Sequence, residues 1–178
     1  MKRIIRKLMK IYYLKIKKVN PMEYEIQRMR KTGLTIGKDC RIFTFIRCNE
    51  ATLVTIGDRV TISGGVEFCT HDNAIIKAIP GKTDVVGRIT IGDDCFIGMR
   101  AILLYGVTLG DHCIVGAGSV VTRSFPPHTV IAGNPARAIC TTEEYAEKYR
   151  DLAIDLKKIP KIERAAYFDA HPEIMAVR

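Results

Sequence analysis

The sequence lacks several features that mark common classes of protein. None of its six cysteines belongs to a CxxC pair, and no two of its four histidines lie within ten residues of each other. The paired ligands of a metal site are therefore missing, and we expect no bound metal. No apolar run is long enough to cross a bilayer. Because lysines interrupt the apolar residues near the N-terminus and no small-residue cleavage site follows, we expect no signal peptide.

Cysteines without a pairing pattern predict a protein of a reducing compartment, which places this chain in the cytoplasm. Three of them, Cys40, Cys95 and Cys113, fall on inward positions of the repeat described below, where a small apolar side chain fits. The 178 residues are 47% hydrophobic, which is enough to bury one core. We therefore expect one compact domain with appendages.

Acidic residues are absent from residues 1–18, which contain eight of the 28 lysines and arginines and carry most of the net charge of +9. Drawn as a helix, this segment has one apolar face and one basic face. Two interpretations are open. The segment contacts an anionic membrane, where each basic residue contributes about 1 kcal/mol, or it packs on the chain and caps it. Nucleic-acid binding is not expected, because no recognised binding fold surrounds the basic residues.

The central part of the sequence carries an aliphatic residue at every sixth position. The series is Ile91, Ile97, Leu103, Leu109, Val115 and Val121. A period of six matches neither a helix nor one face of a strand, so it indicates one side of a polygon around which the chain turns repeatedly. Small or slim residues should face the same interior four positions later. These are Cys95, Ala101, Val107, Cys113 and Ser119. The pattern predicts a solenoid.

Earlier copies of the repeat run from Ile36 to Phe68, with slips between Ile42 and Ile56 and between Phe68 and Ile91. Loops should leave the coil at these slips, and loops on a rigid scaffold are where sites are built. A short helix is expected over residues 22–33, another from Thr142 towards Pro160, and a third over residues 161–168.

The segment from Ile89 to Ile139 reads ITIGDDCFIGMRAILLYGVTLGDHCIVGAGSVVTRSFPPHTVIAGNPARAI and closes with the motif IAGNPAR. In these residues the chain resembles the hexapeptide-repeat acyltransferases, close to the galactoside, maltose and polysaccharide O-acetyltransferases. The resemblance implies an all-β solenoid, a left-handed parallel β-helix, that assembles as a homotrimer with active sites between subunits. Three parts follow: a basic amphipathic helical segment 1–33, the β-helix 34–140 with an excursion loop at 73–88, and a helical segment 141–178.

The resemblance assigns His71 as the catalytic general base, which removes a proton from the acceptor hydroxyl as it attacks a thioester. Asp72, Glu67 or a backbone carbonyl is expected to orient the imidazole ring. Cys69 raises the alternative of a covalent Cys–His mechanism. Because the family transfers the acyl group directly, we interpret Cys69 as a packing residue.

The acceptor is expected under the excursion loop, whose apolar residues would fold over the cleft and pack on the same or an adjacent subunit. Asn49, Glu50 and Asp72 are the candidate substrate-binding residues. The alternative for Asn49 and Glu50 is a solvated corner loop.

The resemblance implies acetyl-CoA as donor, bound along a groove between two subunits. Small residues would let the pantetheine arm approach the backbone, and arginines would meet the phosphates. The matching positions are Gly98, Met99, Ala101, Ala117, Thr122, Arg123 and Arg137. The chain departs from the pattern at Phe96, at Met99, where a serine is usual, and at Cys140, where a second basic residue is usual.

Together these features predict an acetyl-CoA-dependent O-acetyltransferase that modifies a sugar hydroxyl in cell-surface polysaccharide synthesis, either free in the cytoplasm or peripheral on the inner membrane face. N-acetylation of an amino-sugar nucleotide is the alternative within the same enzyme class. A zinc-binding solenoid is disfavoured by the spacing of the histidines. A non-catalytic scaffold would need neither His71 nor Arg137.

Overall fold

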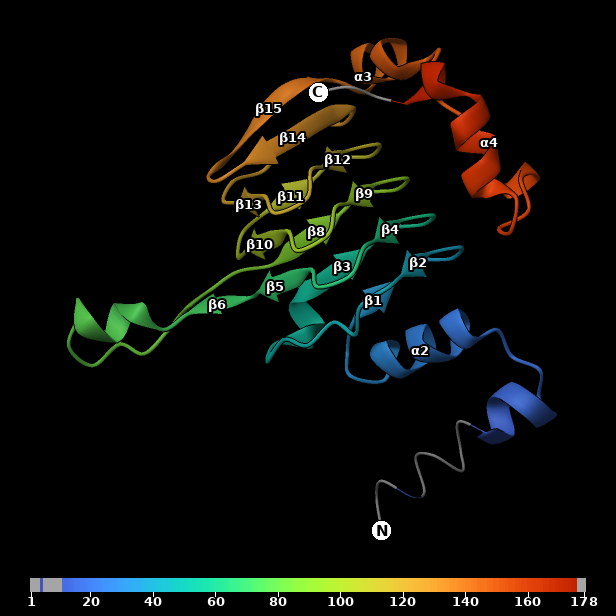
Figure 1. The fold of residues 1–178 in the computed structure, drawn as a ribbon. Helices are drawn as coiled ribbons and strands as arrows, with labels where there is room; N and C mark the ends of the chain where they lie inside the picture. Colours follow the sequence, from blue (N-terminus) through green and yellow to red (C-terminus); the bar gives the residue numbers. More distant parts are fainter. Residues whose placement is uncertain (1–3, 5–10, 176–178) are drawn as a thin grey trace.

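The computed structural model describes residue 4 and residues 11–175. Three sheets of short strands stack into a coil (Figure 1). Sheet I has the order β1 (Thr35–Ile36), β3 (Val54–Ile56), β8 (Ile89–Ile91) and β11 (Thr108–Leu109). Sheet II has the order β15 (Ala136–Thr141), β14 (Thr129–Gly133), β12 (Ile114–Val115), β9 (Phe96–Ile97), β4 (Thr61–Ile62) and β2 (Arg41–Ile42). Sheet III has the order β13 (Val120–Val121), β10 (Ile102–Leu104) and β5 (Glu67–Cys69).

Each turn of the chain visits the three sheets in the same order, as in β8, β9 and β10 and then β11, β12 and β13. Neighbouring strands within the sheets are parallel, apart from the hairpin of β14 and β15 that ends sheet II. We call the loops that lead from sheet II to sheet III the second corner; they contain Ser63, Gly98, Met99, Gly116 and Ala117. The third corner leads from sheet III back to sheet I and contains Thr70, Tyr105, Thr122 and Arg123.

The six-residue repeat lines one continuous interior. All six aliphatic positions from Ile91 to Val121 are at most 1% exposed, and so are the five small positions between them. The same core continues through Ile36, Ile56, Ile62 and Phe68 of the earlier copies. The predicted inward positions are confirmed, whereas Asp72, at the end of the earlier series, is only half-buried.

Glycine at the second corner follows from the stacking of successive turns. A Cβ atom at Gly98 would lie 2.6 Å from the backbone nitrogen of Ala117 in the next turn, well inside van der Waals contact. The residues with left-handed backbone conformation at the corners are mostly not glycine; Asp94, Arg100 and His112 have φ between 56° and 58°.

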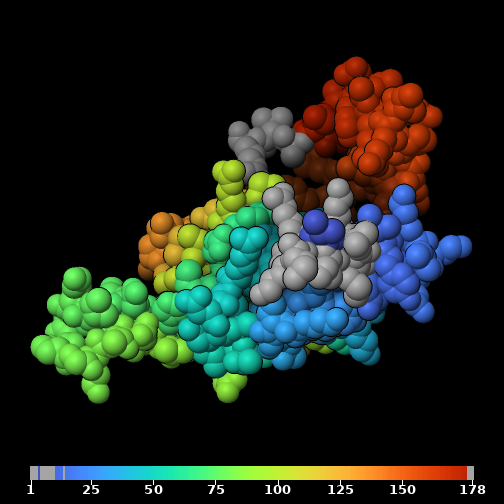
Figure 2. Space-filling model, turned by 90° about the horizontal axis from the view of Figure 1, so that it is seen from below, coloured from blue at the N-terminus to red at the C-terminus, as the bar shows by residue number. Residues whose placement is uncertain are grey.

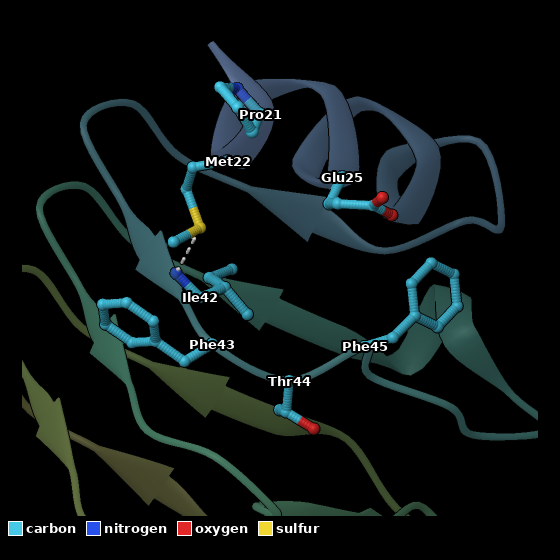
Figure 3. Close-up of a pocket in the computed structure, with 7 residues that line it drawn as sticks. All are labelled: Pro21, Met22, Glu25, Ile42, Phe43, Thr44 and Phe45. Atoms are coloured by element: carbon cyan, nitrogen blue, oxygen red, sulfur yellow. Dashed lines mark hydrogen bonds between the residues drawn. The ribbon is translucent and has the colours of Figure 1, made fainter. Parts of the chain in front are cut away.

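The N-terminal end of the coil is covered by α2 (Pro21–Arg30), which begins where the Asn20 side chain accepts a hydrogen bond of 2.8 Å from the Met22 backbone N–H. Ile26 and Met29 are buried against the first turn. The Met22 sulfur accepts a hydrogen bond from the backbone N–H of Ile42 in β2 (Figure 3). The cap of the coil is therefore α2.

The capping interpretation of residues 1–18 falls partly on residues 1–3 and 5–10, outside the described residues. In the described part, Tyr12–Ile16 forms a single π-helical stretch. Ile11, Tyr12 and Ile16 are 43%, 39% and 68% exposed. These three side chains therefore do not cover the end of the coil. The Tyr13 ring packs on Tyr24 of α2, with 5.5 Å between the ring centroids.

The excursion loop leaves the third corner as an antiparallel ribbon of β6 (His71–Asp72) and β7 (Val85–Val86), with a 3₁₀ turn at Ala74–Lys77. It stands away from the coil in both overall views (Figures 1 and 2). Ile76 and Ile79 are each 48% exposed. The expectation that this loop folds over its own chain is therefore wrong. Its contact with an adjacent subunit stays a prediction.

The chain ends in two helices, α3 (Thr142–Tyr149) and α4 (Arg164–Ala170), with 3₁₀ turns at Leu156–Lys158 and Pro172–Ile174. A further 3₁₀ turn, Ala51–Leu53, precedes β3. A capping box between Thr141 and Glu144 starts α3. The helix α3 ends at Tyr149, well before Pro160 and earlier than the sequence predicted, and it buries no residue. Within the described residues, we find no helix with the length and apolarity needed to span a membrane.

Candidate active site

His71 lies at the third corner, where the chain leaves β5 and enters the excursion ribbon. Its side chain is 28% exposed, and Nδ1 lies 2.9 Å from Oε2 of Glu50. The same Glu50 oxygen accepts a hydrogen bond of 2.6 Å from the hydroxyl of Thr70, a residue that is 1% exposed. Glu50 belongs to the preceding turn of the coil, directly below His71.

The electrostatics of this contact decide which nitrogen of His71 is free. Hydrogen bonds from Thr70 and His71 lower the pKa of Glu50 below its ordinary value, so its carboxylate is ionised near neutral pH. An ionised carboxylate only accepts hydrogen bonds, so Nδ1 of His71 carries the proton. In the neutral ring the lone pair then belongs to Nε2, which is what a general base needs.

The expected orienting groups are not the ones found. Asp72 follows His71 in the same strand, and successive side chains of a strand point to opposite faces. Its carboxylate accepts a hydrogen bond from the Ala74 backbone N–H at 2.8 Å. Glu67 is exposed on β5. The prediction of Asp72 or Glu67 as the partner of the imidazole is wrong, and Glu50 takes that place.

Cys69 lies two residues before His71 and is half-buried. Burial raises the pKa of its thiol, and the charge of Glu67 raises it further. A thiolate is the nucleophile in covalent cysteine catalysis, and a raised pKa disfavours it. The interpretation of Cys69 as a packing residue is thus supported on electrostatic grounds.

A groove of about 670 Å³ runs along the second corner towards α3. It brings together three of the candidate donor-binding residues, Gly98, Met99 and Ala117. Residues that sequence reasoning missed complete it, among them Tyr145, Lys148 and Tyr149 of α3. The sequence signal for them was slight: the helix was expected, but its position over the corner depends on the hairpin that precedes it.

The backbone of this groove offers hydrogen-bond donors. Among the described residues, the backbone N–H groups of Met99 and Ala117 have no acceptor, although the Met99 carbonyl accepts a bond of 2.8 Å from Gly118. Both residues are exposed at the turn. Such donors suit an amide carbonyl or a phosphate oxygen of a bound molecule.

The remaining candidates lie elsewhere. Ala101 is fully buried, and its backbone is engaged by Gly98 and Glu67, so it offers no free polar group. Thr122 and Arg123 follow β13 at the third corner, and Arg123 lies over the Phe125 ring at 5.4 Å. Arg137, on β15, donates to the Ala136 carbonyl at 2.9 Å. Within one chain, the donor-binding candidates are therefore divided between two corners.

Asn49 and Glu50 lie in the loop that precedes the 3₁₀ turn Ala51–Leu53. The hydrogen bonds of Glu50 give it a positioning role towards His71, and its contact with an acceptor stays a prediction, as does that of Asn49 and Asp72. No group of His, Cys, Asp or Glu residues in the described part of the chain could hold a metal ion.

Comparison with known proteins agrees with this geometry. The family described as the hexapeptide repeat of succinyl-transferase matches residues 88–123. Protein CapG of Staphylococcus aureus is 41% identical over 165 residues, which cover 89% of this chain and 94% of CapG. The chain belongs to the hexapeptide-repeat acyltransferase family.

Solved structures extend the comparison of this acyltransferase to three dimensions. A maltose O-acetyltransferase from Clostridium difficile 630 is 27% identical, with a TM-score of 0.57, and the match covers 76% of this chain and 83% of that one. A galactoside acetyltransferase in complex with coenzyme A shares the fold at 22% identity and a TM-score of 0.54, over 80% of this chain and 82% of that one.

Proposed function

We propose that the protein transfers an acetyl group from acetyl-CoA to a sugar hydroxyl, with His71 as general base. The observation that carries the proposal is the hydrogen bond between Nδ1 of His71 and the ionised Glu50, in a chain of an acyltransferase family. It directs Nδ1 of His71 towards Glu50 and leaves Nε2 as the ring nitrogen available to an acceptor.

His71 Nε2 accepts the proton of the acceptor hydroxyl while the hydroxyl oxygen attacks the thioester carbonyl. A new C–O bond forms and the C–S bond breaks. The proton held on His71 is then available to the departing sulfur, so the products are an ester and a free thiol. Glu50 holds the ring in place and stabilises the imidazolium ion that forms in between. The Met99 backbone N–H, which has no acceptor among the described residues, would donate to the developing oxyanion.

The donor site and His71 do not meet within one chain. The groove lies at the second corner and His71 at the third, with β5 between them. We therefore propose a homotrimer in which the groove of one copy faces His71 of its neighbour, which would also unite the divided donor-binding candidates. The exposed apolar residues Ile76, Ile79 and Val86 of the excursion support contact with another copy.

The left-handed winding expected for this family belongs to the same proposal, since the parallel three-sheet coil fits it. The similarity to a maltose O-acetyltransferase supports a sugar as acceptor, and we propose a cell-surface polysaccharide. We also propose that residues 1–18 contact an anionic membrane, which would place the cytoplasmic enzyme beside lipid-linked glycans. The exposed Ile11 and Ile16 and the coverage of the coil by α2 support this proposal over capping.

The test of the catalytic proposal is His71→Ala, assayed by thiol release with acetyl-CoA over a panel of sugars, amino sugars and lipid-linked glycans. Turnover should fall by about 10²- to 10⁴-fold because the base is lost, while coenzyme A binding stays nearly intact. His112→Ala is the matched control, because His112 lies between β11 and β12, away from the third corner, and it should keep full activity. An unchanged rate in His71→Ala would remove this residue from the mechanism. Transfer to amino groups alone would replace O-acetylation by N-acetylation.

A further inference from the structure

Lys148 is the one basic side chain among the residues that line the groove. The other lining residues are apolar or neutral, including Phe96, Ile139 and Tyr145. Its ammonium lies 5.3 Å from the centre of the Tyr149 ring. The positive charge therefore stands on the wall of a mostly apolar groove, where it favours an anion.

The charge of Lys148 is not neutralised by its own helix. Among the described residues, no carboxylate forms an ion pair with it. Arg150, two residues later, differs in this respect, because its Nε donates to Glu147 at 2.9 Å. Arg150, directly after α3, is thus committed to an ion pair with Glu147, whereas Lys148 of α3 is free to bind a ligand.

The position of α3 along the coil decides which end of a ligand it meets. The groove begins at Ser63, in the same turn as His71, and passes Met99 and Ala117 before it reaches α3. From β4 to β14 it spans three strand spacings, which is about 14 Å. A thioester placed for reaction at the level of His71 therefore has the opposite end of its carrier at α3.

We infer that Lys148 binds the 3′-phosphate of coenzyme A. In that molecule the phosphorylated ribose lies at the end remote from the sulfur, which matches the remote position of α3. An ammonium group donates charge-assisted hydrogen bonds to a phosphate, and the apolar surroundings strengthen them. This inference rests on the proposed function, and it makes Lys148 a specificity residue that separates coenzyme A from its dephosphorylated form.

The test compares calorimetric binding of coenzyme A and 3′-dephospho-coenzyme A to the full chain. Lys148→Ala should raise the Kd for coenzyme A about tenfold, since one charged hydrogen bond is lost, and should leave the Kd for the dephosphorylated form unchanged. Lys148→Glu should raise the Kd for coenzyme A further. Arg150→Ala, at the residue that follows α3, is the matched control and should change neither value. Folding is not at risk, because α3 buries no residue.

The outcomes separate the inference from the function on which it rests. If wild-type protein and Lys148→Ala distinguish the two ligands equally well, Lys148 does not bind the 3′-phosphate, although the donor assignment survives. Equal weakening for both ligands would also overturn the inference, because the contact would then lie elsewhere on the molecule. If the wild-type protein binds neither ligand, the proposed function fails and the inference falls with it.

Discussion

The helices near the two ends of the coil, α2 and α3, differ in what they bury. At the N-terminal end, α2 buries Tyr24, Ile26 and Met29 against the first turn. At the C-terminal end, α3 buries no residue, and three of its side chains line the groove instead. A solenoid needs a cap on its terminal repeat, and α2 provides one at the N-terminal end. The difference indicates that α2 is a structural cap and that α3 is available for a ligand.

This division predicts that substitutions at the two ends have opposite effects. Changes in α2 should alter the free energy of unfolding and leave ligand binding intact, while changes in α3 should do the reverse.

The largest expected effect is on stability at the N-terminal end. Ile26→Ala leaves a cavity beneath α2 at a side chain that is 1% exposed, and it should lower the free energy of unfolding by about 2–5 kcal/mol. Tyr145→Ala, at a side chain that is 40% exposed on α3, is the control and should change it little. Denaturant unfolding of both variants measures the difference, and equal losses would abolish the distinction between the ends.

The second prediction separates α2 from the residues that precede it. Deletion of residues 1–18 should leave the unfolding midpoint close to that of the full chain, because α2 already covers the coil. The same deletion should abolish sedimentation with vesicles that contain phosphatidylglycerol, since eight basic residues are lost. Vesicles of phosphatidylcholine alone are the control. A large loss of stability, or no vesicle binding by the full chain, would restore the capping interpretation.

The smallest expected effect concerns Glu50, which lies near the N-terminal end but belongs to the site. Glu50→Gln should lower kcat by about tenfold or more, because His71 loses its ionised partner, and should change stability little. Since the pKa of Glu50 is lowered in the native state, its contribution to stability is present above about pH 4.5 and is lost as the pH falls through the native value. The thermal midpoints of wild type and variant should therefore converge in acid. A gap that widens in acid would contradict the assigned ionisation.

The coil could be predicted from the sequence because its rule is local. Each inward position from Ile91 to Val121 is set by a repeat of six, and every one of them is buried. The position of His71 followed from the same phase, because the chain leaves the coil where the repeat breaks. The repeat does not predict which side chains of successive turns contact each other.

Glu50 was missed as the partner of His71 for this reason. The first two turns pair Ile42 with Ile62, an offset of 20 residues, and Glu50 therefore lies below Thr70. The sequence contains this offset of 20 residues, but the break in the repeat after Ile42 makes it hard to recognise. Asp72 was favoured because it is adjacent in sequence, although adjacent residues of a strand face opposite ways.

The groove could not be predicted in full, because one part of its wall comes from the repeat and the other from a helix outside the repeat. The repeat predicts the positions of Met99 and Ala117 in the groove. The position of Lys148 beside them depends on where the β14–β15 hairpin places α3. Likewise, α3 ends at Tyr149 and buries no residue, although the apolar pattern continues to Leu156.

The central claim is that one active site takes His71 from one copy and the donor groove from another, and subunit hybrids test it most directly. His71→Ala and Ala117→Trp, which fills the groove at an exposed alanine, should each be inactive alone. Refolded together in equal amounts, they should recover about a quarter of wild-type activity, since about one site in four unites an intact base with an intact groove. Hybrids that remain as inactive as the single variants would show that base and donor belong to one chain.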